Sequence, residues 1–176
     1  MYILCVYDYL IQAINKIDIY NCFQLNQANT PNVGSETYKN FEELIINADY
    51  TLCIKNEEVI AFAICFADTD KTIEYLNSVN HKNFKELIKM INNFLYVDRV
   101  AVAENYRHLG IGSELYKKII NYGKSQNYTS VAAEINYLPI KNDISFNFHK
   151  KHGFEEIAIK KYSKEYEVSF QKCNIN

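Results

Sequence analysis

The sequence lacks both an excess of basic residues and a long apolar run. Its 19 Lys and Arg are outnumbered by 21 Asp and Glu, which gives a formal net charge of −2. Because nucleic-acid-binding domains are usually basic, this balance argues against a general affinity for nucleic acid. No apolar run approaches the roughly 20 residues that a helix needs to cross a bilayer. We therefore expect neither a nucleic-acid partner nor a membrane partner.

Paired cysteines and a leader sequence are also missing. The five cysteines are odd in number and widely spaced, and no two of them form a CxxC pair. Several lie within apolar runs, as buried reduced thiols do. The N-terminal stretch MYILCVYDYL has neither the basic start nor the small-residue cleavage site of a signal peptide. These absences predict a reduced, cytoplasmic protein.

What remains is the composition of an ordinary globular domain. Hydrophobic residues make up 48% and charged residues 23% of the 176 positions, as in typical soluble folds. A chain of this length can bury about 70% of the surface of its unfolded state in one core. No repeat or linker divides the sequence, so we expect a single domain over residues 1–176.

Strand and helix patterns alternate along the chain. Strands are predicted at 2–7, 50–55, 58–66, 94–103, 129–136, 154–160 and 165–173. Helices are predicted at 18–29, after a Ser35 cap, at 83–92, after Gly110 and at 142–152. Residues 67–80 form a polar, acidic insert. The fold class is α/β (α+β), with a mixed, mostly antiparallel sheet of six to seven strands and helices on both faces.

A glycine-bearing turn joins the strand at 94–103 to the next helix. The sequence Arg107-His108-Leu109-Gly110-Ile111-Gly112 opens that helix, although each glycine costs roughly 1 kcal/mol relative to alanine there. The free N–H groups and the dipole of a helix start favour an anion, most often a phosphate. We therefore predict an anion site at which Gly110 and Gly112 leave room for the ligand.

Two common nucleotide-binding loops do not fit this turn. No GxxxxGK[ST] string is present, which excludes a Walker A loop. A dinucleotide-binding fold needs a third glycine, but Leu115 occupies that position. Six further residues separate the strand from the first glycine, whereas that fold places the glycine directly after its strand.

A third design matches two motifs in order. Residues 102–112 (VAENYRHLGIG) resemble the V-x-P-x-Y-R-x-x-G-I-G signature of the GCN5-related N-acetyltransferase (GNAT) superfamily. The next marker of that family is N-x-x-[AS]-x-x-x-Y-x-x-x-G-F, which is represented here by Asn142, Ser145, Gly153 and Phe154. The resemblance is densest over residues 94–156. His149 replaces the tyrosine of this second marker. In this replacement and in the segment 25–33, the chain resembles one bacterial branch of the superfamily.

The resemblance implies the GNAT fold, with acetyl-CoA as the donor and no metal. The family's turn holds the pyrophosphate through residues that are here Arg107, His108, Leu109, Gly110, Ile111 and Gly112. By the same carry-over, Val100, Ala101 and Val102 pair with the pantetheine arm. Asn142 either binds that arm or serves only as a helix cap. Lys117, Lys118 and Lys124 either attract the 3′-phosphate or form a solvated helix face.

The catalytic residues are less clearly indicated. The family's tyrosine acid is replaced by His149, which either protonates the thiolate as an imidazolium of ordinary pKa or makes a polar contact to coenzyme A. Glu134 and Asp98 interrupt apolar strands, so both are candidates for the general base. Asp98 is expected to share a strand face with Tyr96, a candidate substrate contact. Arg99 is expected on the opposite face, where it would be a poor partner for Asp98.

Two functions follow from the resemblance. The first is an N-acetyltransferase that acetylates a primary amine of a small-molecule or amino-acid-like substrate by direct attack in a ternary complex. The alternative is a non-catalytic acetyl-CoA-binding or sensing domain of the same fold, which the missing tyrosine keeps open. The sequence leaves the acceptor undecided and is compatible with a homodimer.

Overall fold

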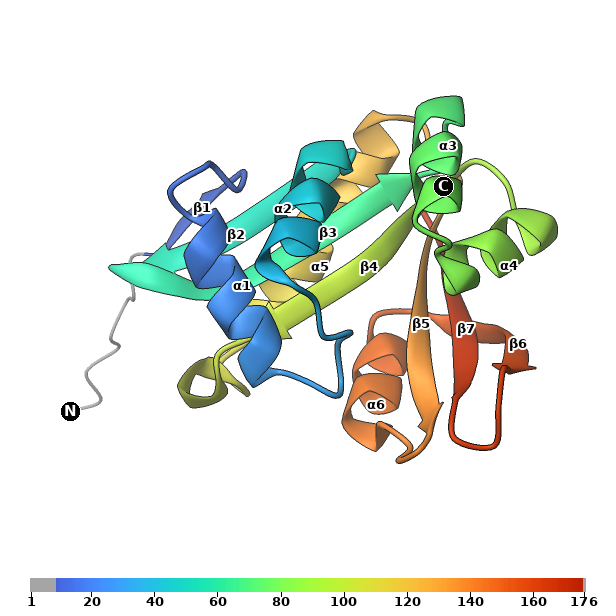
Figure 1. Cartoon of the computed structure of the whole chain (residues 1–176). Helices are drawn as coiled ribbons and strands as arrows, with labels where there is room; N and C mark the ends of the chain where they lie inside the picture. The colour runs from blue at the N-terminus through green and yellow to red at the C-terminus, as the bar shows by residue number, and fades with distance from the viewer. Residues whose placement is uncertain (1–8, 176) are drawn as a thin grey trace.

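The computed structural model describes residues 9–175. One sheet with the strand order β1-β2-β3-β4-β5-β7-β6 runs through the molecule (Figure 1). Its strands are β1 Leu10–Gln12, β2 Tyr50–Asn56, β3 Glu58–Ala67, β4 Phe94–Val102, β5 Ser130–Leu138, β6 Glu155–Lys161 and β7 Glu167–Asn174. Neighbouring strands are antiparallel except β4 and β5, which are parallel. The predicted mixed, mostly antiparallel sheet is therefore confirmed. The strand predicted at 2–7 lies outside the described residues.

The helices follow the predicted order with one addition. They are α1 Ile19–Ala28, α2 Tyr38–Asn47, α3 Asp70–Ser78, α4 Lys82–Met90, α5 Ile111–Ser125 and α6 Asp143–Lys151, with a short 3₁₀ turn η1 at Glu104–Tyr106. The predicted cap at Ser35 was wrong, because Thr37 accepts the N–H of Asn40 at the start of α2. Helix α3 was missed because its sequence is mostly polar and acidic and only Thr72 and Leu76 are buried in it, so it falls within the polar insert predicted at 67–80. Within residues 9–175, no helix has the length and hydropathy needed to span a bilayer.

Helices cover both faces of the sheet, as predicted. Figure 1 shows α1 and α2 in front of the central strands and α5 behind them. Phe41 of α2 and Phe84 of α4 pack into the core on the first face. Leu115 of α5 packs into a second core on the other face, together with Phe154. The four cysteines among the described residues are free and buried, as reduced core thiols should be.

Strands β4 and β5 diverge in the middle of the sheet. Their parallel pairing runs only from Phe94 and Ser130 to Val97 and Ala133. Beyond this point β4 continues beside β3, and β5 continues beside β7. The two strands separate toward the start of α6 in Figure 1. One edge of each strand is thereby left without a strand partner.

A bulge at Asp98 changes which face the side chains of β4 point to. Arg99 lies opposite Ile64 and Val97 lies opposite Cys65, so Asp98 has no opposing residue on β3. Val97 and Val100 consequently both pack toward α5, although three positions separate them. The expected alternation along β4 was therefore wrong: Tyr96 packs on the α1 face, away from Val100 and Val102.

Candidate functional site

A cavity of about 1010 Å³ occupies the gap between β4 and β5. Its lining includes Tyr116 on the α5 face of the sheet and His81 beside α4 on the opposite face, so the cavity passes from one face of the sheet to the other. We call the lining on the α5 face the α5 half: Val100, Val102, Gly110, Gly112, Ser113, Tyr116, Asn142, Ser145 and His149. We call the lining on the opposite face the α4 half: His81, Asn83, Asp98, Glu134 and Tyr166.

The structure brings most of the predicted site residues to this one cavity. The predicted residues that line it are Asp98, Val100, Val102, Arg107, His108, Gly110, Ile111, Gly112, Glu134, Asn142 and His149. Ala101 instead faces the core on the α1 side, and the side chain of Leu109 is 55% exposed. Tyr96 is fully buried and packs against Phe84 and His81. Tyr96 does not line the cavity, so its role as a substrate contact stays a prediction.

The turn before α5 presents unpaired backbone N–H groups. His108 and Gly110 have positive φ angles of 64° and 86°, a conformation that favours glycine. A Cβ added at Gly110 would have no atom within 4 Å, so the space beside it is open. The N–H groups of Ile111, Gly112 and Ser113 make no hydrogen bond with the described residues. With the positive end of the helix dipole, they suit an anion.

Gly112 borders both the cavity and helix α6. A Cβ added there would lie 3.4 Å from the ring of Phe148, which is a van der Waals contact. Gly112 also lines the cavity, so its place beside a bound anion stays a prediction. The ring of Phe148 in turn lies against Tyr116, with centroids 4.9 Å apart.

The loop of residues 29–34, which we call the strap, is bonded to both sides of the cavity. Asn29 Oδ1 accepts a hydrogen bond from Arg107 Nη2 at 2.9 Å. Asn32 Oδ1 accepts one from Asn142 Nδ2 at 3.2 Å, while Asn142 Oδ1 caps α6 by accepting the N–H of Ser145. The strap follows α1 and reaches toward α6 in Figure 1. In the sequence, the only indication that this loop matters was the segment 25–33, which overlaps the strap and was part of the resemblance described above.

Asp98 is held by two basic partners in the α4 half. Its carboxylate accepts hydrogen bonds from His81 Nε2 at 2.7 Å and from Arg99 Nε at 2.8 Å. His81 Nδ1 accepts the N–H of Phe84, so its proton lies on Nε2. Burial raises the pKa of Asp98, but the charge of Arg99 and the hydrogen bonds from His81 and Arg99 outweigh it and lower that pKa to about 2.

Arg99 is therefore the opposite of the poor partner that the sequence predicted. The bulge turns it to the same face as Asp98, where its side chain is 8% exposed. Its guanidinium also donates to Glu36 Oε1 at 3.1 Å and to the carbonyl of Gly34 at 2.8 Å. Asp98 and Arg99 thus form part of a satisfied buried network.

Glu134 differs from Asp98 in its hydrogen bonds and in the direction of its pKa shift. Its Oε1 accepts a hydrogen bond from Asn83 Nδ2 at 3.0 Å, but its buried Oε2 has no hydrogen-bond partner. Burial and then the negative charge of Asp98 raise the pKa of Glu134 above its ordinary value. The sequence ranked these two carboxylates equally, whereas in the structure both oxygens of Asp98 are hydrogen-bonded and one oxygen of Glu134 is not. Asn83 itself was missed, since nothing local distinguishes it from a solvated helix residue.

His149 is buried and neutral. Its Nε2 lies 2.6 Å from Tyr116 Oη, and its Nδ1 lies 2.8 Å from the carbonyl of Ser145. Burial lowers the pKa of His149 to about 4. The expectation of an imidazolium with an ordinary pKa therefore does not hold. In residues 9–175, no three His, Cys, Asp or Glu side chains are arranged to hold a metal ion.

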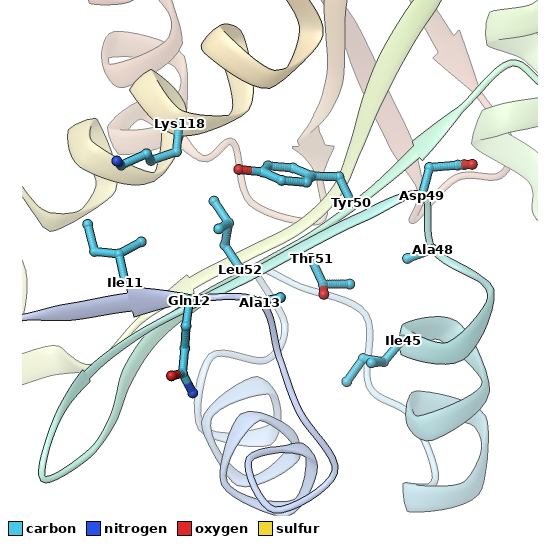
Figure 2. A pocket seen from close by; sticks show the side chains of 10 residues that line it. All are labelled: Ile11, Gln12, Ala13, Ile45, Ala48, Asp49, Tyr50, Thr51, Leu52 and Lys118. Carbon is cyan, nitrogen blue, oxygen red and sulfur yellow. The ribbon is translucent and has the colours of Figure 1, made fainter. Parts of the chain in front are cut away.

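A smaller hollow of about 480 Å³ lies at the outer edge of β2. Figure 2 shows Lys118 of α5 extending over the side of the sheet that carries Ile11, Leu52 and Tyr50. Lys118 thus lines this hollow and not the cavity, which is lined by Lys151 instead. None of the buried unpaired polar atoms in the described residues belongs to the hollow. The larger cavity is therefore the better candidate site.

Known proteins share this fold and its sequence pattern. Residues 18–154 match the family model described as the acetyltransferase (GNAT) family. Ard1 from Thermoplasma volcanium is 18% identical, with 96% of this chain and 98% of that chain covered and a TM-score of 0.74. The ribosomal-protein-S18-alanine N-acetyltransferase from Escherichia coli is 14% identical, with coverage of 96% and 94% and a TM-score of 0.71. The structure of yncA from Salmonella typhimurium with its cofactor acetyl-CoA is 15% identical, with coverage of 96% and 95% and a TM-score of 0.68. A search of curated proteins found no match.

Proposed function

The chain belongs to the acetyltransferase (GNAT) family, and we propose that it transfers the acetyl group of acetyl-CoA to a primary amine by direct attack in a ternary complex. One observation carries this proposal. A single cavity joins a helix start with unpaired N–H groups to a buried carboxylate with an unpaired oxygen. An activated donor can bind at the first end, and a proton can be removed from an amine at the second.

The α5 half fits acetyl-CoA. The unpaired N–H groups of residues 111–113 suit its pyrophosphate, and the open space beside Gly110 lets that group approach the backbone. Beyond Val97 the edge of β4 has no strand partner on the β5 side, so Val100 can pair with amides of the pantetheine arm. The carbonyl of Val102 accepts a hydrogen bond from Arg107 Nε at 3.3 Å, which the arm would have to replace. Acetyl-CoA supplies an acetyl thioester with a thiol as the leaving group.

The α4 half suits the amine. We assign Glu134 as the general base that removes a proton from the substrate ammonium, because its raised pKa and its unpaired Oε2 favour proton uptake. Asp98 keeps both of its partners and orders His81 and Arg99 around the amine end. The negative charges of the two carboxylates attract a cationic amine of small size.

Thiol release from acetyl-CoA across a panel of small primary amines and amino acids tests the proposal. We expect turnover with at least one amine, saturable binding of acetyl-CoA by calorimetry, and loss of turnover but not of binding in Glu134→Gln. Binding without turnover on every amine would favour a non-catalytic acetyl-CoA-binding or sensing domain, which the buried neutral His149 makes the second candidate. Absence of acetyl-CoA binding would refute both functions.

A further inference from the structure

Three side chains of the α5 half form a hydrogen-bonded chain that the proposed function has not used. Tyr116 lies on α5, is 2% exposed and lines the cavity. Its hydroxyl contacts His149 Nε2 at 2.6 Å. On the other side of the imidazole, Nδ1 contacts both the carbonyl of Ser145 at 2.8 Å and Ser145 Oγ at 3.2 Å. Ser145 is only partly buried, so its hydroxyl can exchange protons with solvent.

The two contacts of Nδ1 satisfy both neutral tautomers of His149. When the proton is on Nδ1, it is donated to the carbonyl of Ser145, and Nε2 accepts the hydroxyl proton of Tyr116. When the proton is on Nε2, it is donated to Tyr116 Oη, and Nδ1 accepts the hydroxyl proton of Ser145. In the second arrangement the hydroxyl proton of Tyr116 is free to point into the cavity.

We propose that Tyr116 is the catalytic acid that protonates the leaving thiolate, with His149 and Ser145 as the relay that reprotonates it. The inference rests on the proposed acetyl transfer. The sulfur takes the proton of Tyr116, Tyr116 Oη takes the proton of His149 Nε2, and Nδ1 takes the proton of Ser145 Oγ. Ser145 then takes one proton from solvent. One proton has thus passed from solvent to sulfur, and His149 has changed from its Nε2–H to its Nδ1–H tautomer.

The electrostatics of the site explain why a relay is needed. Burial raises the pKa of Tyr116, and the negative charge of Glu134 raises it further, so a free tyrosinate is disfavoured. Burial also lowers the pKa of His149, so an imidazolium acid is disfavoured. If the protons move together while His149 changes from one neutral tautomer to the other, neither a tyrosinate nor an imidazolium forms. His149 stands where the family's second marker has tyrosine, and in this chain it passes protons to Tyr116. The acid is therefore a tyrosine of α5.

Kinetic measurements with acetyl-CoA and the amines that react give the first test. We expect Tyr116→Phe to lower kcat by about 10²–10⁴-fold with little change in KM. We expect Ser145→Ala to lower kcat by about tenfold, the effect of one hydrogen bond, while the carbonyl contact of His149 is kept. Tyr122→Phe is the matched control, because this hydroxyl lies on the same helix but donates only to the carbonyl of Asp49. A Tyr116→Phe variant that is folded by circular dichroism and fully active would overturn the assignment.

The tautomer of His149 gives a second readout that does not depend on turnover. Ring ¹⁵N spectra should show the Nδ1–H form in the free protein. Coenzyme A added near pH 9, above an ordinary thiol pKa of about 8.5, should shift it toward Nε2–H. Desulfo-coenzyme A lacks the sulfur and should bind without this shift, and Tyr116→Phe should abolish it. Binding of coenzyme A with an unchanged tautomer would refute the relay alone, whereas no binding of either ligand would refute the proposed function.

Discussion

The two halves of the cavity are built from different chemistry. The α5 half offers backbone groups of one continuous segment, namely the N–H groups that follow Gly110 and the open edge of β4. The α4 half consists of side chains from β4, β5, the start of α4 and the turn between β6 and β7, and Glu134 in it is held by Asn83. The backbone groups of the first half can be tested with little effect on folding, although Tyr116 and His149 of the same half are buried. The second half is part of the core, so each change there affects catalysis and stability together.

Glu134→Gln should give the largest effect on activity and should change catalysis and stability together. We expect kcat to fall by about 10²–10⁴-fold, since a general base is lost, with the affinity for acetyl-CoA unchanged. Because the folded-state pKa of Glu134 is raised, its ionisation destabilises the fold as the pH rises through that pKa. The amide removes this cost, so the free energy of unfolding near pH 7 should rise by about 1–2 kcal/mol.

Thiol release, calorimetry and urea unfolding check the three quantities in turn. Glu58→Gln, an exposed position at the start of β3, is the control and should change none of them. A Glu134→Gln variant that is both active and less stable than the parent would show that this carboxylate is a structural ion and not the base.

Ser113→Asp should separate binding from folding in the α5 half. Ser113 lies in the first turn of α5 and lines the cavity. A carboxylate about 4 Å from a bound phosphate adds roughly 4 kcal/mol of repulsion, so acetyl-CoA affinity should fall about 100-fold or more. The same carboxylate suits the helix dipole and should stabilise the fold by about 0.3–1 kcal/mol.

Ser113→Asn has nearly the same shape without the charge and is the matched control. Calorimetry should find its affinity for acetyl-CoA close to that of the parent. Equal affinities for the Asp and Asn variants would show that no anion binds at this helix start.

The difference between the two halves of the cavity also explains which site residues could be predicted from the sequence. The α5 half was found because its backbone geometry needs glycine at a positive φ, and this requirement leaves a local motif. Of the α4 half only Asp98 and Glu134 were predicted, whereas Asn83 was missed because it lies 51 positions from Glu134 and meets it only in the folded sheet. The face of Arg99 was wrong because one bulged residue reverses the alternation of a strand, whereas Asp98 does share a face with Tyr96, since His81 contacts both. The sequence gives no local sign of that bulge.

Asp98→Asn should affect stability in the opposite direction to Glu134→Gln, although the two carboxylates line the same half. The pKa of Asp98 is lowered from 3.8 to about 2, so its ionised form stabilises the fold above pH 4 and this contribution is lost as the pH falls toward 2. Near pH 7 the variant should lose about 2 kcal/mol of unfolding free energy. Urea unfolding near pH 7 and again near pH 2 measures this, and the difference from the parent should disappear at the lower pH. A loss that is equal at both pH values would show that packing, not charge, is responsible.

Asn32→Ala should have the smallest effect. It tests whether the strap competes with acetyl-CoA for the amide of Asn142 or contacts the ligand itself. Asn32 Oδ1 accepts a hydrogen bond from the amide of Asn142, which the resemblance makes a candidate contact to the pantetheine arm. If that hydrogen bond must be exchanged for one to the ligand, removing it should raise acetyl-CoA affinity about two- to tenfold, the value of one ordinary hydrogen bond. Asn121→Ala, at an exposed position of α5, should leave the calorimetric affinity unchanged. A fall in affinity on Asn32→Ala would mean that the strap contacts the ligand directly and is a third wall of the site, so that the cavity could no longer be described as two halves.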